Sequence, residues 1–176
     1  MRAAGLSVLL AAALTGCVSG PVGNARPPEP VRAVALDRYL GKWYELARYD
    51  MAFERGCEAV TAEYSLRPDG LIKVVNSCHK GTPDGPLAVA VGRAKRVGDP
   101  LGARLKVSFF GPFFADYWVL DHGPDYEWSI VGEGSGRYLW ILSRDPHPPQ
   151  AVRDDLVRRV KAMGYDLKLL RITRQK

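Results

Sequence analysis

The sequence predicts an all-β protein whose short antiparallel strands form a barrel or a sandwich, with one α-helix near the C-terminus. Apolar runs of strand length recur along the chain and are separated by turn residues at regular spacing. The run Ala103–Phe110 alternates cleanly, with Leu105, Val107 and Phe109 on one face and polar side chains on the other. One stretch, after Pro149, instead has apolar residues at helical spacing.

The composition fits a single domain with a substantial core, since the chain has 176 residues of which 47% are hydrophobic. Its 25 basic and 19 acidic residues leave a formal net charge of +6. Such a surplus can suit nucleic acid or an anionic membrane surface. Here the charges are spread along the chain rather than clustered, which indicates a solvated surface and no nucleic-acid partner.

Residues 1–16 predict a lipoprotein signal peptide. Met1-Arg2 supplies a positive start, and Leu6–Leu14 is an apolar run too short to span a bilayer. Leu14-Thr15-Gly16-Cys17 resembles a bacterial lipobox, at which the cysteine is acylated and becomes the new N-terminus. Val18 stands where an aspartate would favour the inner membrane, so we expect a lipid anchor in the outer membrane and a domain facing the periplasm. The alternative is an ordinary secretory signal with an incidental cysteine.

Residues 17–35 predict a tether that begins at the acylated cysteine. The stretch contains Pro21, Pro27, Pro28 and Pro30 and has no periodic apolar pattern. Because a proline-rich chain extends about 3 Å per residue, such a tether would hold the domain tens of ångströms from the membrane. The folded domain is then expected over residues 36–176.

Eight strands are predicted. They are Trp43–Tyr49, Cys57–Leu66, Leu71–Cys78, Leu87–Val97, Ala103–Phe110, Phe113–Asp121, Tyr126–Gly132 and Tyr138–Arg144. Arg67-Pro68-Asp69-Gly70 between the second and third has the composition of a hairpin turn. If eight such strands close in up-and-down order, they leave room for one small ligand.

The predicted helix begins after Pro148 and Pro149 and ends near Gly164. Its apolar stripe consists of Val152, Leu156, Val157, Val160 and Met163. We expect this stripe to pack on the outside of the strands. An amphipathic membrane helix is the alternative, although the mixed charge on its polar face argues against it. A short final strand is expected over Leu169–Thr173.

Three segments carry a resemblance to the lipocalin family. Gly41-Lys42-Trp43-Tyr44-Glu45-Leu46-Ala47-Arg48 resembles the family's G-x-W signature in the form typical of bacterial lipocalins and apolipoprotein D. Leu142-Ser143-Arg144 resembles the end of the last barrel strand. Val107–Phe113, followed by Tyr117–Leu120, is similar to the bacterial sequence between the fifth and sixth strands. The resemblance covers roughly residues 36 to 173.

The resemblance implies an eight-stranded antiparallel up-and-down barrel with one C-terminal helix outside. It also implies that Arg144 lies across Trp43 at the closed base, where an arginine stacks on the family's signature tryptophan. Both residues are therefore expected to be structural rather than catalytic.

Cys57 and Cys78 lie on the two arms of the first hairpin, nearly opposite each other about the turn at Pro68-Asp69. In an oxidising compartment a disulfide is the natural expectation, and it would staple the open rim. The alternatives are a pair of buried thiols or a catalytic cysteine. Pairing would remove the thiolate that catalysis needs.

Other catalytic patterns do not fit. The glycine-rich run Gly132–Gly136 precedes a strand rather than a helix, so it does not predict a dinucleotide site. His79, His122 and His147 are scattered without ligand spacing. No G-x-S-x-G elbow is present. The sequence therefore predicts no catalytic residue, no metal and no cofactor.

The expected ligand-binding residues follow from alternation along the last strands. If Arg144 points inward to reach Trp43, every second residue before it does so as well. The full expected set is Leu105, Val107, Phe109, Tyr117, Val119, Tyr138, Trp140 and Leu142. This apolar, aromatic cup suits an acyl chain. The open rim is expected to carry Arg55, His79, Lys80 and Arg137, a mildly basic setting for a phosphate or carboxylate head.

These features together predict an outer-membrane lipocalin that stores or transports a small lipid for cell-envelope maintenance. The expected ligand is a fatty acid or lysophospholipid. Two alternatives remain open: an enzyme acting on a lipid held in the same cup, and a structural envelope lipoprotein with a filled barrel.

Overall fold

The computed structural model describes residues 21–176; the expected signal peptide and Cys17 lie outside this range. The described chain forms nine strands and four helical segments. The strands are β1 (Gly41–Tyr49), β2 (Cys57–Leu66), β3 (Ile72–Lys80), β4 (Leu87–Arg96), β5 (Arg104–Ser108), β6 (Ala115–His122), β7 (Trp128–Gly132), β8 (Leu139–Ser143) and β9 (Leu170–Ile172). The helices are α1 (Leu36–Tyr39) and α2 (Gln150–Ala162), with short 3-10 turns η1 (Ala52–Glu54) and η2 (Leu167–Leu169).

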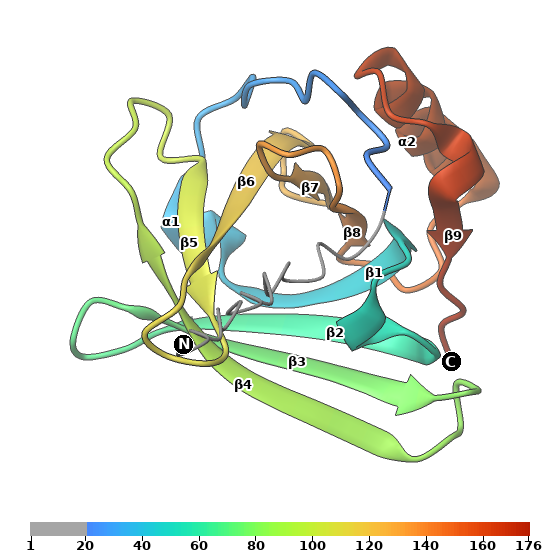
Figure 1. The fold of residues 1–176 in the computed structure, drawn as a ribbon, viewed down its shortest axis with the longest axis horizontal. Coiled ribbons are helices and arrows are strands. Elements are labelled where there is room, and N and C mark those ends of the chain that lie inside the picture. Colours follow the sequence, from blue (N-terminus) through green and yellow to red (C-terminus); the bar gives the residue numbers. More distant parts are fainter. Residues whose placement is uncertain (1–20) are drawn as a thin grey trace, which may run out of the picture.

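The strands close into a barrel in up-and-down order, as the sequence predicts (Figure 1). Each strand from β2 to β7 pairs with the next, β8 pairs with β1, and β1 pairs back to β2. All these pairings are antiparallel. The ninth strand, β9, is added to β1 on the side that α2 covers.

The ring is completed by the C-terminal segment where β1 and β2 separate. The two strands pair only over the first part of β1, at Gly41–Tyr44. Beyond that point the Thr173 amide donates to the Leu46 carbonyl at 3.0 Å. The Ala59 amide in turn donates to the Arg174 carbonyl at 2.7 Å. The end of the chain therefore supplies hydrogen bonds that β1 and β2 do not give each other.

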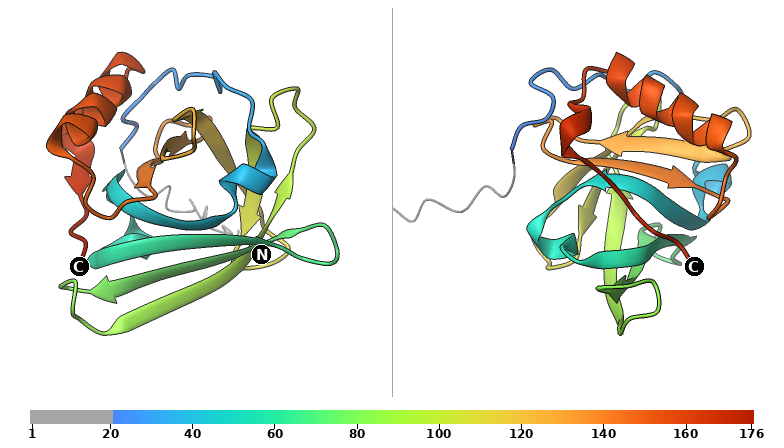
Figure 2. Two further views of the ribbon diagram at one scale, coloured as in Figure 1. Left: turned by 180° about the vertical axis from the view of Figure 1, so that it is seen from behind. Right: turned by 90° about the vertical axis from the view of Figure 1, so that its right-hand side faces the viewer.

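Apolar side chains form one core inside the barrel and a second one outside it. The inner cluster surrounds Trp43, whose side chain is fully buried at the base. The outer cluster lies between α2 and the outward faces of β1, β6, β7 and β8, with Leu156 and Val160 at its centre (Figure 2). Alternation along each strand sends successive side chains to these two cores.

The helix follows the sequence prediction closely. It begins at Gln150 directly after Pro149 and ends at Ala162, with Gly164 at φ +91° just beyond. Its stripe is buried against the barrel, which contradicts the alternative of an amphipathic membrane helix. Between residues 21 and 176, no helix has the length and apolar character needed to cross a membrane.

The predicted limits of the fifth, sixth and seventh strands are wrong. Tyr126 was expected to begin the seventh strand, but it lies in the preceding turn with φ +58°, and β7 begins at Trp128. The chain also leaves the sheet between Ser108 and Ala115. Phe110 and Phe113 therefore lie in a loop at the end of the barrel rather than in strands.

The expected tether is also wrong for residues 21–34, which pack along the outside of the barrel. The Gly23 amide donates to the Gly136 carbonyl at 2.9 Å. Further along, the Val34 amide donates to the Leu101 carbonyl at 2.7 Å. Asn24 is buried, and its side chain donates to the Met163 carbonyl at 2.8 Å. Residues 21–34 therefore form a packed segment whose hydrogen-bond partners are distant in sequence.

Candidate ligand-binding site

The barrel encloses a cavity of about 640 Å³ that opens at the end where the β1–β2 and β5–β6 loops lie. Its walls are mainly apolar and aromatic, and its deep end is formed by Tyr39 and Tyr64. The volume falls within the range of about 300–1,000 Å³ that is usual for small-molecule sites. A barrel filled with its own side chains is contradicted by this cavity.

Seven of the eight expected ligand-binding residues line the cavity: Leu105, Val107, Phe109, Tyr117, Tyr138, Trp140 and Leu142. Val119 is fully buried in the inner cluster but does not border the cavity. The rings of Tyr138 and Trp140 stack with centroids 5.9 Å apart, and Trp140 stacks on Tyr117 at 6.5 Å. One wall of the cup is therefore a continuous aromatic surface.

Three tyrosine hydroxyls meet at the deep end of the cup. The Tyr117 hydroxyl lies 3.0 Å from that of Tyr39 and 2.9 Å from that of Tyr64. Tyr39 also reaches the Ser129 hydroxyl at 3.1 Å. Burial raises the pKa of Tyr39 to about 12 and also raises the pKa of Tyr64 and Tyr117 well above the usual value of a phenol. The phenols therefore stay neutral and form a hydrogen-bonded floor under an apolar cup.

Two carboxyl groups and one guanidinium lie beside Trp140, near the mouth. Arg48 is fully buried and donates from Nη1 to Glu45 Oε1 at 2.6 Å. Its Nη2 donates to the Glu54 carbonyl at 3.0 Å. Glu54 Oε2 accepts a hydrogen bond from Trp140 Nε1 at 3.1 Å. Thr173, from the C-terminal segment, also contacts both Arg48 and Glu45.

Glu54 is the group in this cluster whose proton affinity changes most clearly. Burial, together with the charge of the nearby Glu45 carboxyl, raises its pKa to about 8. The hydrogen bond from Trp140 and the charge of Arg48 act in the opposite direction but do not prevail. One guanidinium faces two carboxyls in an apolar wall, so Glu54 keeps its proton at neutral pH.

Sequence reasoning missed this cluster because of an irregularity in β1. Simple alternation from an inward Trp43 would place Glu45 and Ala47 inside and Arg48 outside. The pairing of β1 with β8 shifts register between Glu45 and Ala47. Ala47 consequently joins the outer core, while Arg48 points toward the interior beside Glu45. The sequence offered one signal of this cluster, which was the presence of Glu45 and Arg48 within an otherwise mostly apolar strand.

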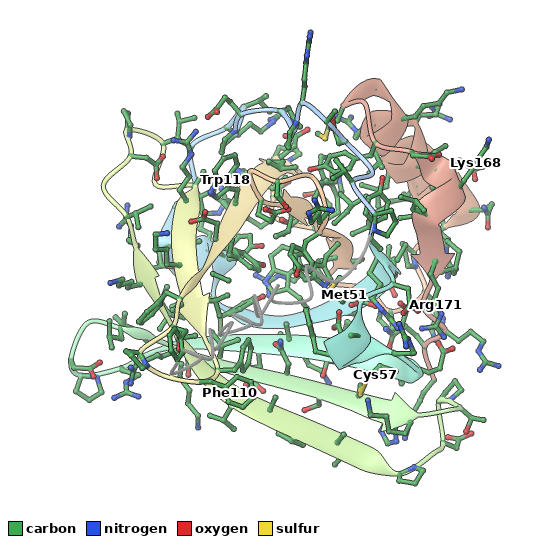
Figure 3. All side chains as sticks on the ribbon, viewed as in Figure 1. Met51, Cys57, Phe110, Trp118, Lys168 and Arg171 are labelled. Atoms are coloured by element: carbon green, nitrogen blue, oxygen red, sulfur yellow. A yellow bond between two sulfur atoms is a disulfide. The ribbon has the colours of Figure 1, made fainter. Side chains whose placement is uncertain are left out.

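Cys57 and Cys78 form a disulfide in the wall of the cavity, with Cα atoms 5.4 Å apart (Figure 3). They are not directly opposite, because Cys57 pairs with Lys80 and the β2–β3 register shifts after Glu58. The bridge therefore runs diagonally between the strands. Neither sulfur is then available as the thiolate that a catalytic cysteine at either position would need.

Arg144 lies over Trp43 at the closed base, with its guanidinium carbon 3.8 Å from the ring centroid. Its Nη1 donates to the Lys42 carbonyl at 2.7 Å, and its Nη2 donates to the Leu40 carbonyl at 2.8 Å. Partial burial lowers the pKa of Arg144 from its very high ordinary value. Arg144 and Trp43 therefore connect α1, which covers the closed end of the barrel, to the ends of β1 and β8, far from the mouth.

Most residues of the expected basic rim do not border the cavity itself. Of Arg55, His79, Lys80 and Arg137, only Lys80 borders the cavity. His79 instead bonds through Nδ1 to the Gly85 carbonyl at 2.7 Å. Because Cys78 points into the barrel, the next residue, His79, points outward. Among the described residues, the titratable groups in the cavity wall other than tyrosines are Lys80 and the carboxyls of Glu45, Glu54 and Asp116.

The fold and site define a class of protein: a β-barrel with a mainly apolar cup that is open at one end and has the size of a small-molecule site. Within the part of the chain that the structure covers, no group of three or more His, Cys, Asp or Glu residues is placed to hold a metal ion. The family model of the lipocalin-like domain matches residues 34–175. The chain belongs to the lipocalin family.

Curated relatives agree with this assignment. The chain is 40% identical to the outer membrane lipoprotein Blc of Escherichia coli K12 over 163 residues, covering 90% of this chain and 91% of the relative. It is 39% identical to the protein of the same name from Vibrio cholerae over 160 residues, with 90% and 91% covered. It is also 34% identical to apolipoprotein D of Rattus norvegicus over 161 residues, with 82% of each chain covered.

Solved structures show the same fold at lower identity. Insecticyanin from Manduca sexta superposes with a TM-score of 0.67 at 19% identity, covering 88% of this chain and 87% of that one. The cockroach allergen Per a 4 superposes with a TM-score of 0.65 at 18% identity, covering 88% and 96%.

Proposed function

We propose that this protein holds one single-chain amphiphile, a fatty acid or a lysophospholipid, in its cup. The observation that carries the proposal is the cavity of about 640 Å³, whose walls are mostly hydrocarbon and aromatic rings. Each methylene transferred from water to such a wall contributes about 0.8 kcal/mol. A long acyl chain therefore gains enough to offset the cost of ordering it, whereas a sugar or nucleotide would leave its polar groups unpaired.

The proposed orientation places the tail inside and the head at the mouth. The aromatic wall of Tyr117, Tyr138 and Trp140 extends from the floor toward the opening, so the tail would lie along it. Lys80 borders the mouth and offers an ammonium to a phosphate or carboxylate. The tyrosine hydroxyls at the floor already satisfy one another and do not require a polar ligand atom.

The proposed location is the outer membrane, reached through acyl chains on Cys17. The lipobox-like sequence before that residue supports it. Relatives at 39–40% identity are named outer membrane lipoprotein Blc, which supports it independently. Several acyl chains give durable membrane attachment where a single chain gives only marginal binding. We propose that the domain faces the periplasm, where lipid released from the envelope would be collected for storage or transport.

The direct test is a titration of the protein beginning at Pro21 with fatty acids and lysophospholipids of increasing chain length, followed by tryptophan fluorescence. We expect saturable one-to-one binding that weakens as the chain is shortened. Trp140→Glu, which adds a further carboxyl beside Glu45 and Glu54 in the cavity wall, should abolish it. Val91→Glu provides the matched control, because Val91 is 58% exposed on the outer face of β4. Binding that is independent of chain length, or unchanged by Trp140→Glu, would contradict the proposal.

An enzyme acting on a lipid in the same cup is the second candidate, and one observation favours it. Glu54 is a carboxyl with a pKa of about 8 inside a cavity, as a general acid or base would be. Mass spectrometry of lipid recovered after prolonged incubation decides between the two functions. We expect the ligand to be recovered intact. A cleaved or transferred product that disappears in Glu54→Gln would replace the binding function with an enzymatic one.

A further inference from the structure

The open end of the barrel carries three exposed phenylalanines, which we call the aromatic rim: Phe53, Phe110 and Phe113. Their side chains are 63%, 83% and 78% exposed, and all three border the mouth of the cavity. They come from two separate loops, η1 between β1 and β2 and the segment between β5 and β6 (Figure 3). Large exposed aromatic side chains gathered at one place mark an interaction surface rather than ordinary solvent-facing positions.

The N-terminal segment is fixed at this same end. Gly23 and Asn24 both donate their amides to the Gly136 carbonyl, in the loop that joins β7 to β8 beside the mouth. Gly136 has φ +66°, and a side chain there would meet the Asn24 carbonyl oxygen at 1.8 Å. The glycine therefore lets the segment seat directly on the loop. Figure 2 (right) shows the start of the described chain and η1 toward one end of the barrel, with α1 toward the other.

Chain length then limits how far the mouth can be from the proposed anchor. Cys17 precedes Pro21 by four residues, which span at most about 14 Å even when fully extended. A ten-residue strand such as β2 is about 33 Å long, so the closed base lies a further barrel length away. An acylated Cys17 would therefore keep the mouth, and not the base, beside the lipid headgroups.

Two basic side chains next to the aromatic rim also suit a lipid membrane as the partner of this surface. Arg93 and Lys95 of β4 lie over the Phe114 ring, at 5.6 Å and 4.5 Å from its centroid. In the described chain neither cation is paired with a carboxylate. Aromatic side chains with basic residues just behind them suit the boundary between acyl chains and phosphate headgroups.

We propose that the barrel docks mouth-down on the membrane, with the aromatic rim inserted among the lipids, so that an amphiphile passes between leaflet and cup without crossing water. The inference rests on the proposed lipid anchor at Cys17. A free spacer of the length expected from the sequence would have permitted any orientation. The packed segment over residues 21–34 replaces that freedom with a short attachment at one end.

The test uses the full lipidated protein reconstituted in phosphatidylcholine vesicles with either brominated or plain acyl chains. Phe110→Trp and Phe113→Trp each add an indole at the rim, and Leu66→Trp adds one at the closed end as the matched control. Leu66 is suitable because it is 60% exposed at the β2–β3 turn. We expect brominated lipid to quench the added fluorescence at 110 and 113, and to leave that at 66 unquenched.

Flotation of the vesicles separates failure of this inference from failure of the anchor. Protein that floats but shows no added quenching at the rim, or equal quenching at Leu66→Trp, overturns the mouth-down orientation and leaves the anchor intact. Wild-type protein that does not float overturns both. A rim indole that is shielded only at high protein density, without quenching by lipid, would show a second copy of the chain on the rim and also overturn the inference.

A second measurement tests the consequence for exchange. Phe110→Ser combined with Phe113→Ser should slow transfer of a fluorescent lysophospholipid between vesicles and the anchored protein by about tenfold or more. Leu66→Ser should transfer at the wild-type rate. Equal transfer rates in the rim double variant and wild type would refute direct passage through the rim.

Discussion

Replacing Glu54 by glutamine should remove a pH dependence of stability that the wild-type protein carries. Glu54 lies in the cavity wall beside Glu45 and Arg48 and accepts a hydrogen bond from Trp140. Glutamine keeps the volume and an oxygen for the Trp140 N–H but never ionises. The variant therefore changes the charge of the cluster at high pH and little else.

The sign and size follow from the pKa. The pKa of Glu54 rises from 4.5 to about 8 on folding, chiefly because of burial and then the charge of Glu45. Between these values the folded protein holds a proton that the unfolded chain has lost, so the free energy of unfolding falls as pH rises. At 1.36 kcal/mol per pH unit, the window sets an upper limit of about 5 kcal/mol. Stability should be highest near pH 5 and lowest above pH 8.

Urea unfolding at several pH values, with the disulfide intact, measures the effect. We expect Glu54→Gln to match the wild type near pH 5 and to become more stable than it by a few kcal/mol at pH 8 and above. Glu63→Gln is the matched control, since Glu63 is exposed on the outer face of β2. Parallel pH profiles for the wild type and Glu54→Gln would refute the reasoning, as would a wild-type protein that gains stability between pH 5 and pH 8.

Three further substitutions test other parts of the fold. Replacing both Cys57 and Cys78 by serine opens a bridge between residues 21 apart in sequence and should cost about 3 kcal/mol in urea unfolding, while lipid binding persists. Arg144→Lys keeps the charge but loses the planar stacking on Trp43 and several carbonyl contacts, so we expect a loss of about 1–3 kcal/mol; an unchanged midpoint would contradict a structural role. Tyr117→Phe removes the hydroxyl shared by two neighbouring phenols and should cost about 1–2 kcal/mol without weakening acyl-chain binding.

The features that the sequence predicted well are those decided by local pattern. Alternation in residues 103–110 placed Leu105 and Val107 inside the barrel, because strand geometry sends every second side chain to one face. The helix limits followed from Pro149 and Gly164, whose backbone preferences act within one turn. The resemblance added the contact between Arg144 and Trp43, which no local rule supplies.

The features that were missed depend on contacts between distant segments. The inward turn of Arg48 requires a register shift in β1, and its partner Thr173 comes from the opposite end of the chain. Packing of residues 21–34 depends on backbone hydrogen bonds to distant parts of the chain. Every residue type except proline can donate such bonds, so the composition of the segment does not reveal them. A proline-rich segment without apolar periodicity therefore has the sequence of a spacer whether or not it packs against the rest of the fold.

The acidic wall and the C-terminal segment are two consequences of one structural requirement. Where β1 and β2 separate toward the mouth, their backbone groups need partners that the neighbouring strand does not supply. The Arg48 guanidinium donates one such hydrogen bond to the Cys57 carbonyl at 3.2 Å. Thr173 and Gln175, from the C-terminal segment, donate others to carbonyls of β1. A buried guanidinium in turn needs carboxylates close by, which accounts for Glu45. Glu54 adds a further carboxyl to this wall, and its retained proton keeps the wall of the proposed lipid-binding cup uncharged at that point.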